Sequence, residues 1–357
     1  MSTVQLPKHT EPEFVMKRRR SETADEELIV ATLNLQYFSS YPEDKDDAAK
    51  ARLRQELGGA DMIAVQEGIS GRSVLVEAGF DLVCCAGERG IAQTVRDMVY
   101  GDDAALKACP EHLHGMLLCN QLYIRRESAW KVADCGVKQV SSCFDLDGAG
   151  GRCSGPLAVR SMVWAKVQKS TKTAVVMSTH ISGGRFEDQY FVQKLARERH
   201  QQVEGCIAFF EDERPGSRSS GDVGILVGDF NAVAEYKQRG AMQSYYNFAI
   251  AKAAGVQADA EKLGLSSPEK IELAFEEYML APFTTLRSKG WSFAYRQEDV
   301  GPTSAFGHLV DHMSTTGNVR CKAAEVKHFT NQKSGAGQQD TDLVITDHNA
   351  VVAKFAL

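Results

Sequence analysis

Short apolar runs recur along the whole sequence, and their length limits the structures they can form. Each run has roughly four to eight residues and is rich in Val, Ile and Leu, which is typical of buried strands. The runs are residues 28–35, 61–67, 117–124, 161–167, 173–180, 224–230, 308–313 and 348–355. The sequence therefore predicts strands spread from one end of the chain to the other.

Helical patterns lie between some of these runs. Residues 44–58 and 187–205 repeat apolar side chains at helical spacing. A third helix is predicted to start with Ser267 as its N-cap and Pro268 at its first position. Because strands and helices alternate without a linker or an internal repeat, we expect an α/β fold.

The domain organisation follows from this alternation. We expect one domain over residues 28–357, with a helical insertion around 232–300. Residues 1–27 are polar and lack periodicity, which indicates a mobile tail. The tail carries a basic KRRR run at 17–20, which is either a nuclear import signal or phosphate contact, or a solvated charge run.

Composition excludes several classes of protein. The net charge of -6 argues against a strongly basic nucleic-acid-binding protein, although it leaves a nucleic-acid substrate open. No apolar run approaches the ~18 residues of a membrane span, and the N-terminus lacks the apolar core of a signal peptide. The nine cysteines include no Cys-x-x-Cys, so free thiols are expected. We therefore expect an intracellular protein of the nucleus or cytoplasm, with no obligate protein partner evident.

Polar side chains sit beside six of the apolar runs. They are Asn34 and Gln36, Gln66 and Glu67, His180, Asp229 and Asn231, Asp311 and His312, and Asp347 and His348. Any single one is explained as a turn residue. Together they are oxygen and imidazole groups, which suit Mg²⁺ or Mn²⁺ binding and phosphoester hydrolysis.

The six segments read "TLNLQ", "VQEG", "STHISGG", "GDFNA", "LVDHM" and "TDHNAV". In this order the chain resembles the endonuclease/exonuclease/phosphatase superfamily. The resemblance implies a four-layer α/β/β/α sandwich, in which two mixed β-sheets pack together and helices flank them. It also implies a divalent-metal-dependent phosphoester hydrolase.

The resemblance further implies a role for each polar residue. The metal residues are Glu67 as the principal ligand, Asp347 as a second carboxylate, and Asn34, which also supports the substrate. The catalytic residues are Asp229 and Asn231 at the attacking water, His348 at the scissile phosphate with Asp311 orienting it, and His180 at the phosphate or leaving group. Whether Asp229 or His348 is the general base stays open at this point.

Two further residues are substrate-binding candidates. Arg160 falls where some members of the superfamily contact phosphate, and the alternative is an exposed strand charge. Asn120 is a weaker candidate for supporting His180. Gln36 stands where apurinic endonucleases carry an aspartate, which argues against that activity. Thr346 replaces the usual serine before the last motif.

The remaining histidines and aromatic residues are less informative. His112, His114, His200, His308 and His312 are assigned to surface or packing positions. The aromatic residues Trp291, Phe293, Tyr295 and Phe306 either stack on a base or lipid, or belong to the core.

The leading hypothesis is a Mg²⁺-dependent phosphodiesterase, a nuclease that cleaves nucleic acid with an activated water, and Mn²⁺ is a possible replacement. The alternative is a phosphomonoesterase, or a lipid or inositol-phosphate hydrolase, of the same fold. A non-catalytic binding protein is disfavoured because the set of ligand residues is whole.

Overall fold

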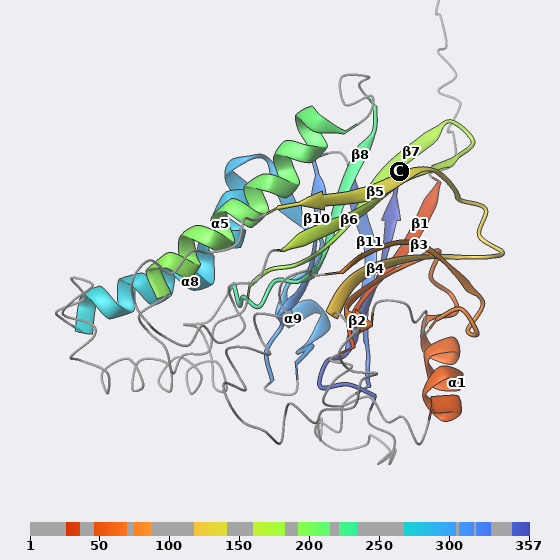
Figure 1. Ribbon diagram of the computed structural model, residues 1–357, viewed down its shortest axis with the longest axis horizontal. Helices are drawn as coiled ribbons and strands as arrows, with labels where there is room; N and C mark the ends of the chain where they lie inside the picture. Colours follow the sequence, from red (N-terminus) through yellow and green to blue (C-terminus); the bar gives the residue numbers. More distant parts are fainter. Residues whose placement is uncertain are drawn as a thin grey trace, which may run out of the picture.

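Two six-stranded sheets face each other in the computed structural model (Figure 1). The structure describes residues 26–35, 46–69, 75–87, 118–140, 160–182, 192–214, 221–234, 268–304, 307–317, 319–329 and 345–357. The basic run at 17–20, His112, His114, Gln36, Ser267 and Phe306 lie outside these residues, so the expectations about them stay predictions.

The first sheet has the order β11-β12-β1-β2-β4-β3. Its strands are β1 (Glu27–Asn34), β2 (Met62–Ile69), β3 (Phe80–Gly87), β4 (Leu118–Arg125), β11 (Arg320–Lys327) and β12 (Ala350–Ala356). The strands β1 and β2 are parallel, and the other neighbours in this sheet are antiparallel. The first and last strands that the structure describes, β1 and β12, therefore pair inside one sheet.

The second sheet has the order β5-β6-β7-β8-β10-β9. Its strands are β5 (Lys131–Gln139), β6 (Ser161–Lys169), β7 (Lys172–His180), β8 (Val223–Asp229), β9 (Trp291–Phe293) and β10 (Asp311–Thr316). Only β7 and β8 are parallel in this sheet. Both sheets are therefore mixed, as predicted.

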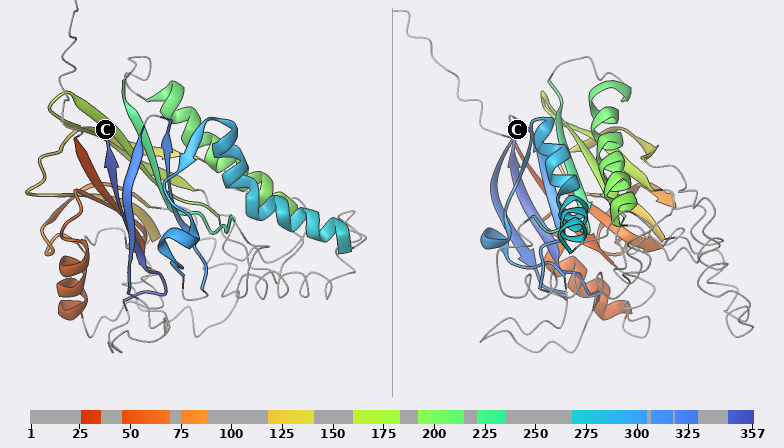
Figure 2. Two further views of the ribbon diagram at one scale, coloured as in Figure 1. Left: turned by 180° about the vertical axis from the view of Figure 1, so that it is seen from behind. Right: turned by 90° about the vertical axis from the view of Figure 1, so that its left-hand side faces the viewer.

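Helices cover the outer faces of the two sheets (Figure 2). The helix α1 (Asp46–Leu57) packs on the first sheet, and the helices α5 (Val192–Ala208) and α8 (Pro268–Ser288) lie side by side against the second. A π-helical turn, η3 (Phe209–Glu213), follows α5, and the short α9 (Gln297–Val300) follows β9. No helix in the described part of the chain combines the length and apolar character needed to cross a membrane.

Side-chain alternation along the strands explains the layers. In β1, Leu28 and Val30 belong to the core between the sheets, whereas Ala31 and Leu33 pack with the α1 side. All four side chains are fully buried. A strand that is apolar on both faces reads as a continuous apolar run, which is why these central strands are visible in the sequence. The four-layer α/β/β/α sandwich is confirmed.

The apolar runs found in the sequence do not include β3, β5, β9 and β11. These four strands are the edge strands of the two sheets. Most side chains of β5 and β11 are exposed or half-buried, so these strands need no apolar run. The interval 232–300 contains the strand β9 as well as the helices α8 and α9, so its described part is not purely helical.

Strand pairing brings the polar strand ends together. His180 at the end of β7 is the register partner of Asp229 on β8, and Asp229 is in turn opposite Asp311 on β10. Gly228 makes this close approach possible, because its φ is 143° and a Cβ there would lie 1.8 Å from the carbonyl oxygen of Thr179.

Candidate active site

Asp229 lies at the centre of the polar cluster and is 1% exposed. Its Oδ2 accepts a hydrogen bond from Asn34 Nδ2 at 2.9 Å, and its Oδ1 accepts one from the Asn231 backbone N–H at 2.7 Å. Burial raises the pKa of Asp229, and the Asp311 carboxylate adds to this rise against the opposing effect of His348. The carboxylate is therefore a strengthened proton acceptor.

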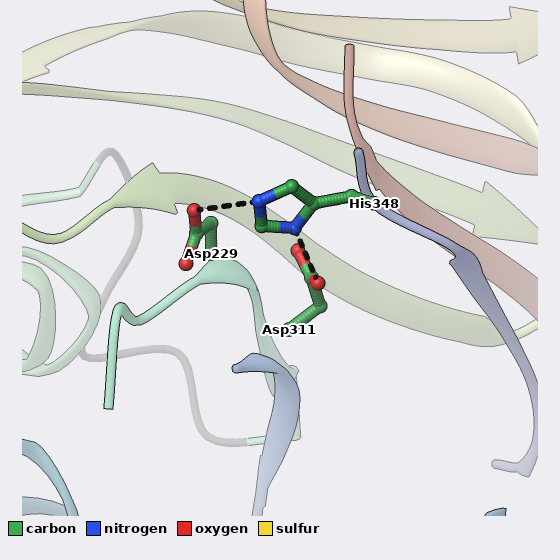
Figure 3. A group of neighbouring side chains, drawn as sticks. All are labelled: Asp229, Asp311 and His348. Atoms are coloured by element: carbon green, nitrogen blue, oxygen red, sulfur yellow. Dashed lines mark hydrogen bonds and ion pairs between the residues drawn. The ribbon is translucent and has the colours of Figure 1, made fainter. Parts of the chain in front are cut away.

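His348, which is half-buried, pairs with the buried Asp311, with 2.9 Å between His348 Nδ1 and Asp311 Oδ2 (Figure 3). The other ring nitrogen, Nε2, lies 3.9 Å from Asp229 Oδ2 and 3.8 Å from Asp347 Oδ1. Burial alone would lower the pKa of His348, but Asp311, Asp229 and Asp347 outweigh it and raise this pKa to about 10. The imidazole is therefore held as a cation with Nε2–H pointing into the cluster.

His180 is held in the opposite charge state. Its Nδ1 lies 2.9 Å from the guanidinium of Arg160, which can only donate, so the ring proton sits on Nε2. Burial, then the positive charges of Arg160 and His348, hold the pKa of His180 well below its usual value. Nε2 lies 3.7 Å from Glu67 Oε1 and 3.6 Å from Asp229 Oδ2, so it is a neutral donor within the cluster.

Glu67 occupies an unusual backbone position with a φ of +51°, at the point where the pairing between β2 and β4 is interrupted. Asn34 Nδ2 donates to Glu67 Oε1 at 3.1 Å. Burial raises the pKa of Glu67 to about 7. The hydrogen bond from Asn34 opposes this rise, and the negative charge of Asp229 adds to it. Asn231 is also left-handed, with a φ of +47°. Such positions cost free energy and concentrate at functional sites.

The last motif joins this cluster from the segment before β12, in the same sheet as β1 and β2. Thr346 Oγ1 donates to the carbonyl oxygen of Asn34 at 2.8 Å and accepts from the His348 backbone N–H at 3.2 Å. The hydroxyl of Thr346 therefore fixes the segment that carries Asp347 and His348 against the end of β1. Segments far apart in the chain meet at one edge of the sandwich.

No protein-family model and no curated protein matches the sequence. Among solved structures, an endonuclease/exonuclease/phosphatase from Bacteroides vulgatus aligns with a TM-score of 0.51 and 15% identity over 93% of this chain and 100% of that one. The human Nocturnin catalytic domain, with bound sulfate, aligns with a TM-score of 0.52 and 11% identity over 93% and 96%. A mannosyl-6-phosphatase from Bacteroides thetaiotaomicron gives 0.50 and 14% over 92% and 100%.

The chain has the endonuclease/exonuclease/phosphatase fold. The fold that the sequence motifs imply is thereby confirmed. At these low identities the likeness concerns the fold alone, so activity must be argued from the site itself.

The carboxylates of the polar cluster in this endonuclease/exonuclease/phosphatase fold are suited to binding a divalent cation. Among the described residues, Asp229, Asp311 and His348 place three candidate ligand atoms within 4.8 Å of one another. Since His348 Nδ1 is already bonded to Asp311, we regard these three as a proton-handling group. Asp347 Oδ1 is buried without a hydrogen-bond partner, and burial raises the pKa of Asp347. An unsatisfied buried carboxylate oxygen is the group that a cation would stabilise.

The two substrate-binding candidates behave differently. Arg160 is 6% exposed and bonded to His180, so the alternative of an exposed strand charge is wrong. Asn120 Nδ2 donates to the carbonyl oxygen of Ser161 at 2.6 Å. Arg160, rather than Asn120, therefore supports His180. Asn120 Oδ1 is buried without a hydrogen-bond partner.

Two other histidines have packing positions, as the sequence indicated. His312 is 2% exposed, packs against Phe230 and Phe283, and lies with Nε2 2.9 Å from the carbonyl oxygen of Ala232. Burial lowers the pKa of His312 to about 4, so it is neutral. His308 is 3% exposed, and burial lowers its pKa too.

Arg199 is a site residue that the strand-end pattern cannot find, because it lies on α5. Its side chain is 0% exposed. The guanidinium donates to the backbone carbonyls of Ser182 at 2.5 Å, Phe230 at 2.9 Å, Asn231 at 3.1 Å and Tyr278 at 3.0 Å. Arg199 therefore ties the segments that follow His180 and Asp229 to the two outer helices.

A sequence signal for Arg199 exists. It lies three residues after Ala196 and four before Val203, and both of these are on the buried face of α5. An arginine on the apolar face of an amphipathic helix needs acceptors inside the protein.

Replacing Arg199 by Met is expected to lower the free energy of unfolding by about 3 kcal/mol or more, because buried carbonyl groups lose their donors. Denaturant unfolding of the variant measures this effect. Arg197→Met, an exposed position on the same helix, is the matched control and should change stability by less than about 0.5 kcal/mol. Equal effects of the two substitutions would contradict the assignment.

The cation-free protein is expected to lose stability as the pH rises from about 7 to about 10. The folded-state pKa of His348, about 10, exceeds its ordinary value of 6.5, so the folded protein retains a proton that the unfolded chain releases. This stabilisation is fully present below about pH 6.5 and is lost as the pH passes the folded-state value, with a slope of up to about 1.4 kcal/mol per pH unit. Urea unfolding in a chelator at several pH values, compared with His348→Gln, measures the slope. Parallel curves for the two proteins would contradict the prediction.

Proposed function

We propose that this protein is a divalent-metal-dependent phosphodiesterase that cleaves nucleic acid by attack of an activated water on phosphate. The observation that carries the proposal is the single hydrogen-bonded cluster at the edge of the sandwich. It links Asn34, Glu67, Asp229 and Asn231, and it has His180 and the His348–Asp311 pair beside it. A proton acceptor, two oriented imidazoles and free carboxylate oxygens are the parts that phosphoester hydrolysis needs.

Asp229 is the proposed general base. Its pKa is raised by burial first, which increases its proton affinity, while two donors hold its oxygens in place. His348 is a poor base in this state because its pKa is about 10 and it already carries a proton. These charge states favour Asp229 over His348 for accepting the proton of the attacking water.

The two histidines are proposed to bind the phosphate by donating from Nε2. His348 would donate as a cation, because Asp311 holds Nδ1 and stabilises the imidazolium. His180 would donate as a neutral ring, because Arg160 occupies Nδ1. Its pKa lies well below 6.5, so His180 does not supply a proton as a general acid near neutral pH.

Glu67 and Asp347, with Asn34 beside them, are the residues proposed to hold a Mg²⁺ or Mn²⁺ ion. Such an ion would neutralise phosphate charge and stabilise the leaving oxygen. The raised pKa values of Glu67 and Asp347, both caused first by burial, are consistent with carboxylates placed for a positive charge.

The alternative is a phosphomonoesterase or a lipid or inositol-phosphate hydrolase. A mannosyl-6-phosphatase has the same fold, which keeps this class open. A non-catalytic binding protein remains disfavoured because the acceptor, both imidazoles and the carboxylates are all in place.

A substrate panel tests the proposal. Wild-type protein in Mg²⁺ is assayed with single-stranded DNA, duplex DNA, RNA, inositol phosphates and sphingomyelin. We expect cleavage of at least one nucleic acid. Cleavage of only the inositol phosphates or sphingomyelin would refute the nuclease proposal and support the alternative, and cleavage of none would refute both.

A further inference from the structure

A second feature of the described residues lies near the start of β10, on the opposite face of the sheet from the His348–Asp311 pair. It is a cavity of about 240 Å³ between α8 and the segments that lead into and out of β9 and β10. Its walls include Phe283 and Arg287 of α8, Phe293 of β9 and His312 of β10. Asp311 and His312 are neighbours on a strand, so Asp311 faces His348 while His312 faces this cavity on the opposite side of the sheet.

The cavity is close to the site along the chain. His312 directly follows Asp311, and Val233 in the cavity wall comes two residues after Asn231. Each residue spans at most about 3.6 Å, so these walls begin only a few ångströms from catalytic residues. Tyr295, another wall residue, donates its hydroxyl to the backbone carbonyl of Asp311 at 3.1 Å. The cavity therefore begins at the same end of β10 as the site, on the opposite face of the sheet.

The charge of the cavity favours an anion. Arg287 and Arg296 contribute two guanidinium groups, and no acidic side chain is among the described residues that line it. Arg296 already forms ion pairs with Glu298 and Asp299. Arg287 is exposed, lies 5.8 Å over the ring of Phe293, and has no acidic partner among the residues that the structure describes. Arg287 is therefore the group available to a phosphate.

The remaining walls favour a flat apolar ring. Phe293 is half-buried, and Phe283, Tyr295 and Leu309 line the cavity beside it. His312 adds a ring without charge, because burial lowers its pKa to about 4. The volume of about 240 Å³ is below the roughly 300–1,000 Å³ of pockets that enclose drug-sized ligands, so one ring system fits better than a whole ligand.

We propose that this cavity receives the nucleotide next to the scissile phosphate, with its base against the Phe293 wall and an adjacent phosphate at Arg287. The inference rests on the proposed function, and it makes a single-stranded nucleic acid the substrate class. Aromatic side chains stack on bases, and arginine binds phosphate. A phosphosugar or inositol phosphate offers anions but no flat ring, and a short phosphodiester offers no second phosphate.

The test compares two substrates in Arg287→Gln. One is a fluorescein-labelled eight-residue oligothymidylate, and the other is methyl p-nitrophenyl phosphate, which occupies only the catalytic site. We expect kcat/KM for the oligonucleotide to fall about tenfold, with most of the change in KM, and the small phosphodiester to be hydrolysed at an unchanged rate. Lys289→Gln, one residue after the end of the same helix and outside the cavity, is the matched control and should behave as wild type.

Binding of the same oligonucleotide, followed by fluorescence anisotropy in EDTA, tests the cavity without requiring turnover. Arg287→Gln should weaken binding and reduce the slope of log K against log salt by about 0.7, the value for one phosphate contact on a single strand. If wild type hydrolyses neither substrate, the proposed function fails, and the anisotropy alone decides the cavity. Equal binding by wild type and Arg287→Gln, or an equal loss in Lys289→Gln, would overturn the inference.

Discussion

Replacing Asp229 by Asn is expected to lower kcat for phosphodiester hydrolysis by about 10³-fold, within the range of general acid–base catalysis. The amide has almost the same shape as the carboxylate, but it cannot accept the proton of the attacking water. Asp229 Oδ2 also accepts from Asn34 at 2.9 Å, so Asn at this position keeps one oxygen acceptor. Steady-state kinetics with a chromogenic phosphodiester measures the loss.

The control for this variant is Asp134→Asn, a change of the same type on the exposed edge strand β5. It should leave kcat unchanged. Far-ultraviolet circular dichroism and thermal unfolding establish that the Asp229 variant is folded. If the folded variant turned over as fast as the parent, Asp229 would not be the general base.

Replacing Glu67 by Gln is expected to lower kcat/KM by about 100-fold or more, because the proposed cation loses its principal anionic ligand. The Mg²⁺ concentration for half-maximal activity should rise as well. Gln keeps an oxygen that can accept from Asn34 Nδ2, so the substitution removes charge without removing this contact. A Mg²⁺ titration of activity separates weaker cation binding from slower chemistry.

The same residue predicts a pH dependence. The pKa of Glu67, raised first by burial, is about 7 in the cation-free protein, so protons and the cation compete for it near neutral pH. Apparent Mg²⁺ affinity of wild type should therefore rise between about pH 6 and pH 8 and then level off. In Glu67→Gln this rise should be reduced, and an unchanged pH dependence would contradict the assignment of Glu67 as the principal ligand.

How far the sequence predicts the fold depends on where each strand lies. Central strands such as β1 and β8 are buried on both faces, so they read as continuous apolar runs. The edge strand β5 has mainly exposed side chains, and β9 has three residues, so neither leaves such a run. Apolar runs in a sequence indicate buried strands. They do not reveal a strand that is held mainly by backbone pairing with its neighbour.

The candidate site follows the same logic. Asp229 and His180 are visible because each interrupts the end of an apolar run, and the strand register then places them opposite each other. Arg160 could not be assigned in the same way, since only the structure places its side chain against His180. Arg199 and Arg287 come from helices, where nothing in the strand pattern connects them to the site. Roles set by tertiary contact therefore required the structure.

We propose that one cluster of side chains binds a divalent cation and a phosphate together. Hydrolysis of a phosphodiester by wild-type protein, measured before and after addition of EDTA and again after excess Mg²⁺, tests this claim most directly. We expect the chelator to abolish turnover and excess Mg²⁺ to restore it. Undiminished turnover in EDTA would contradict this claim.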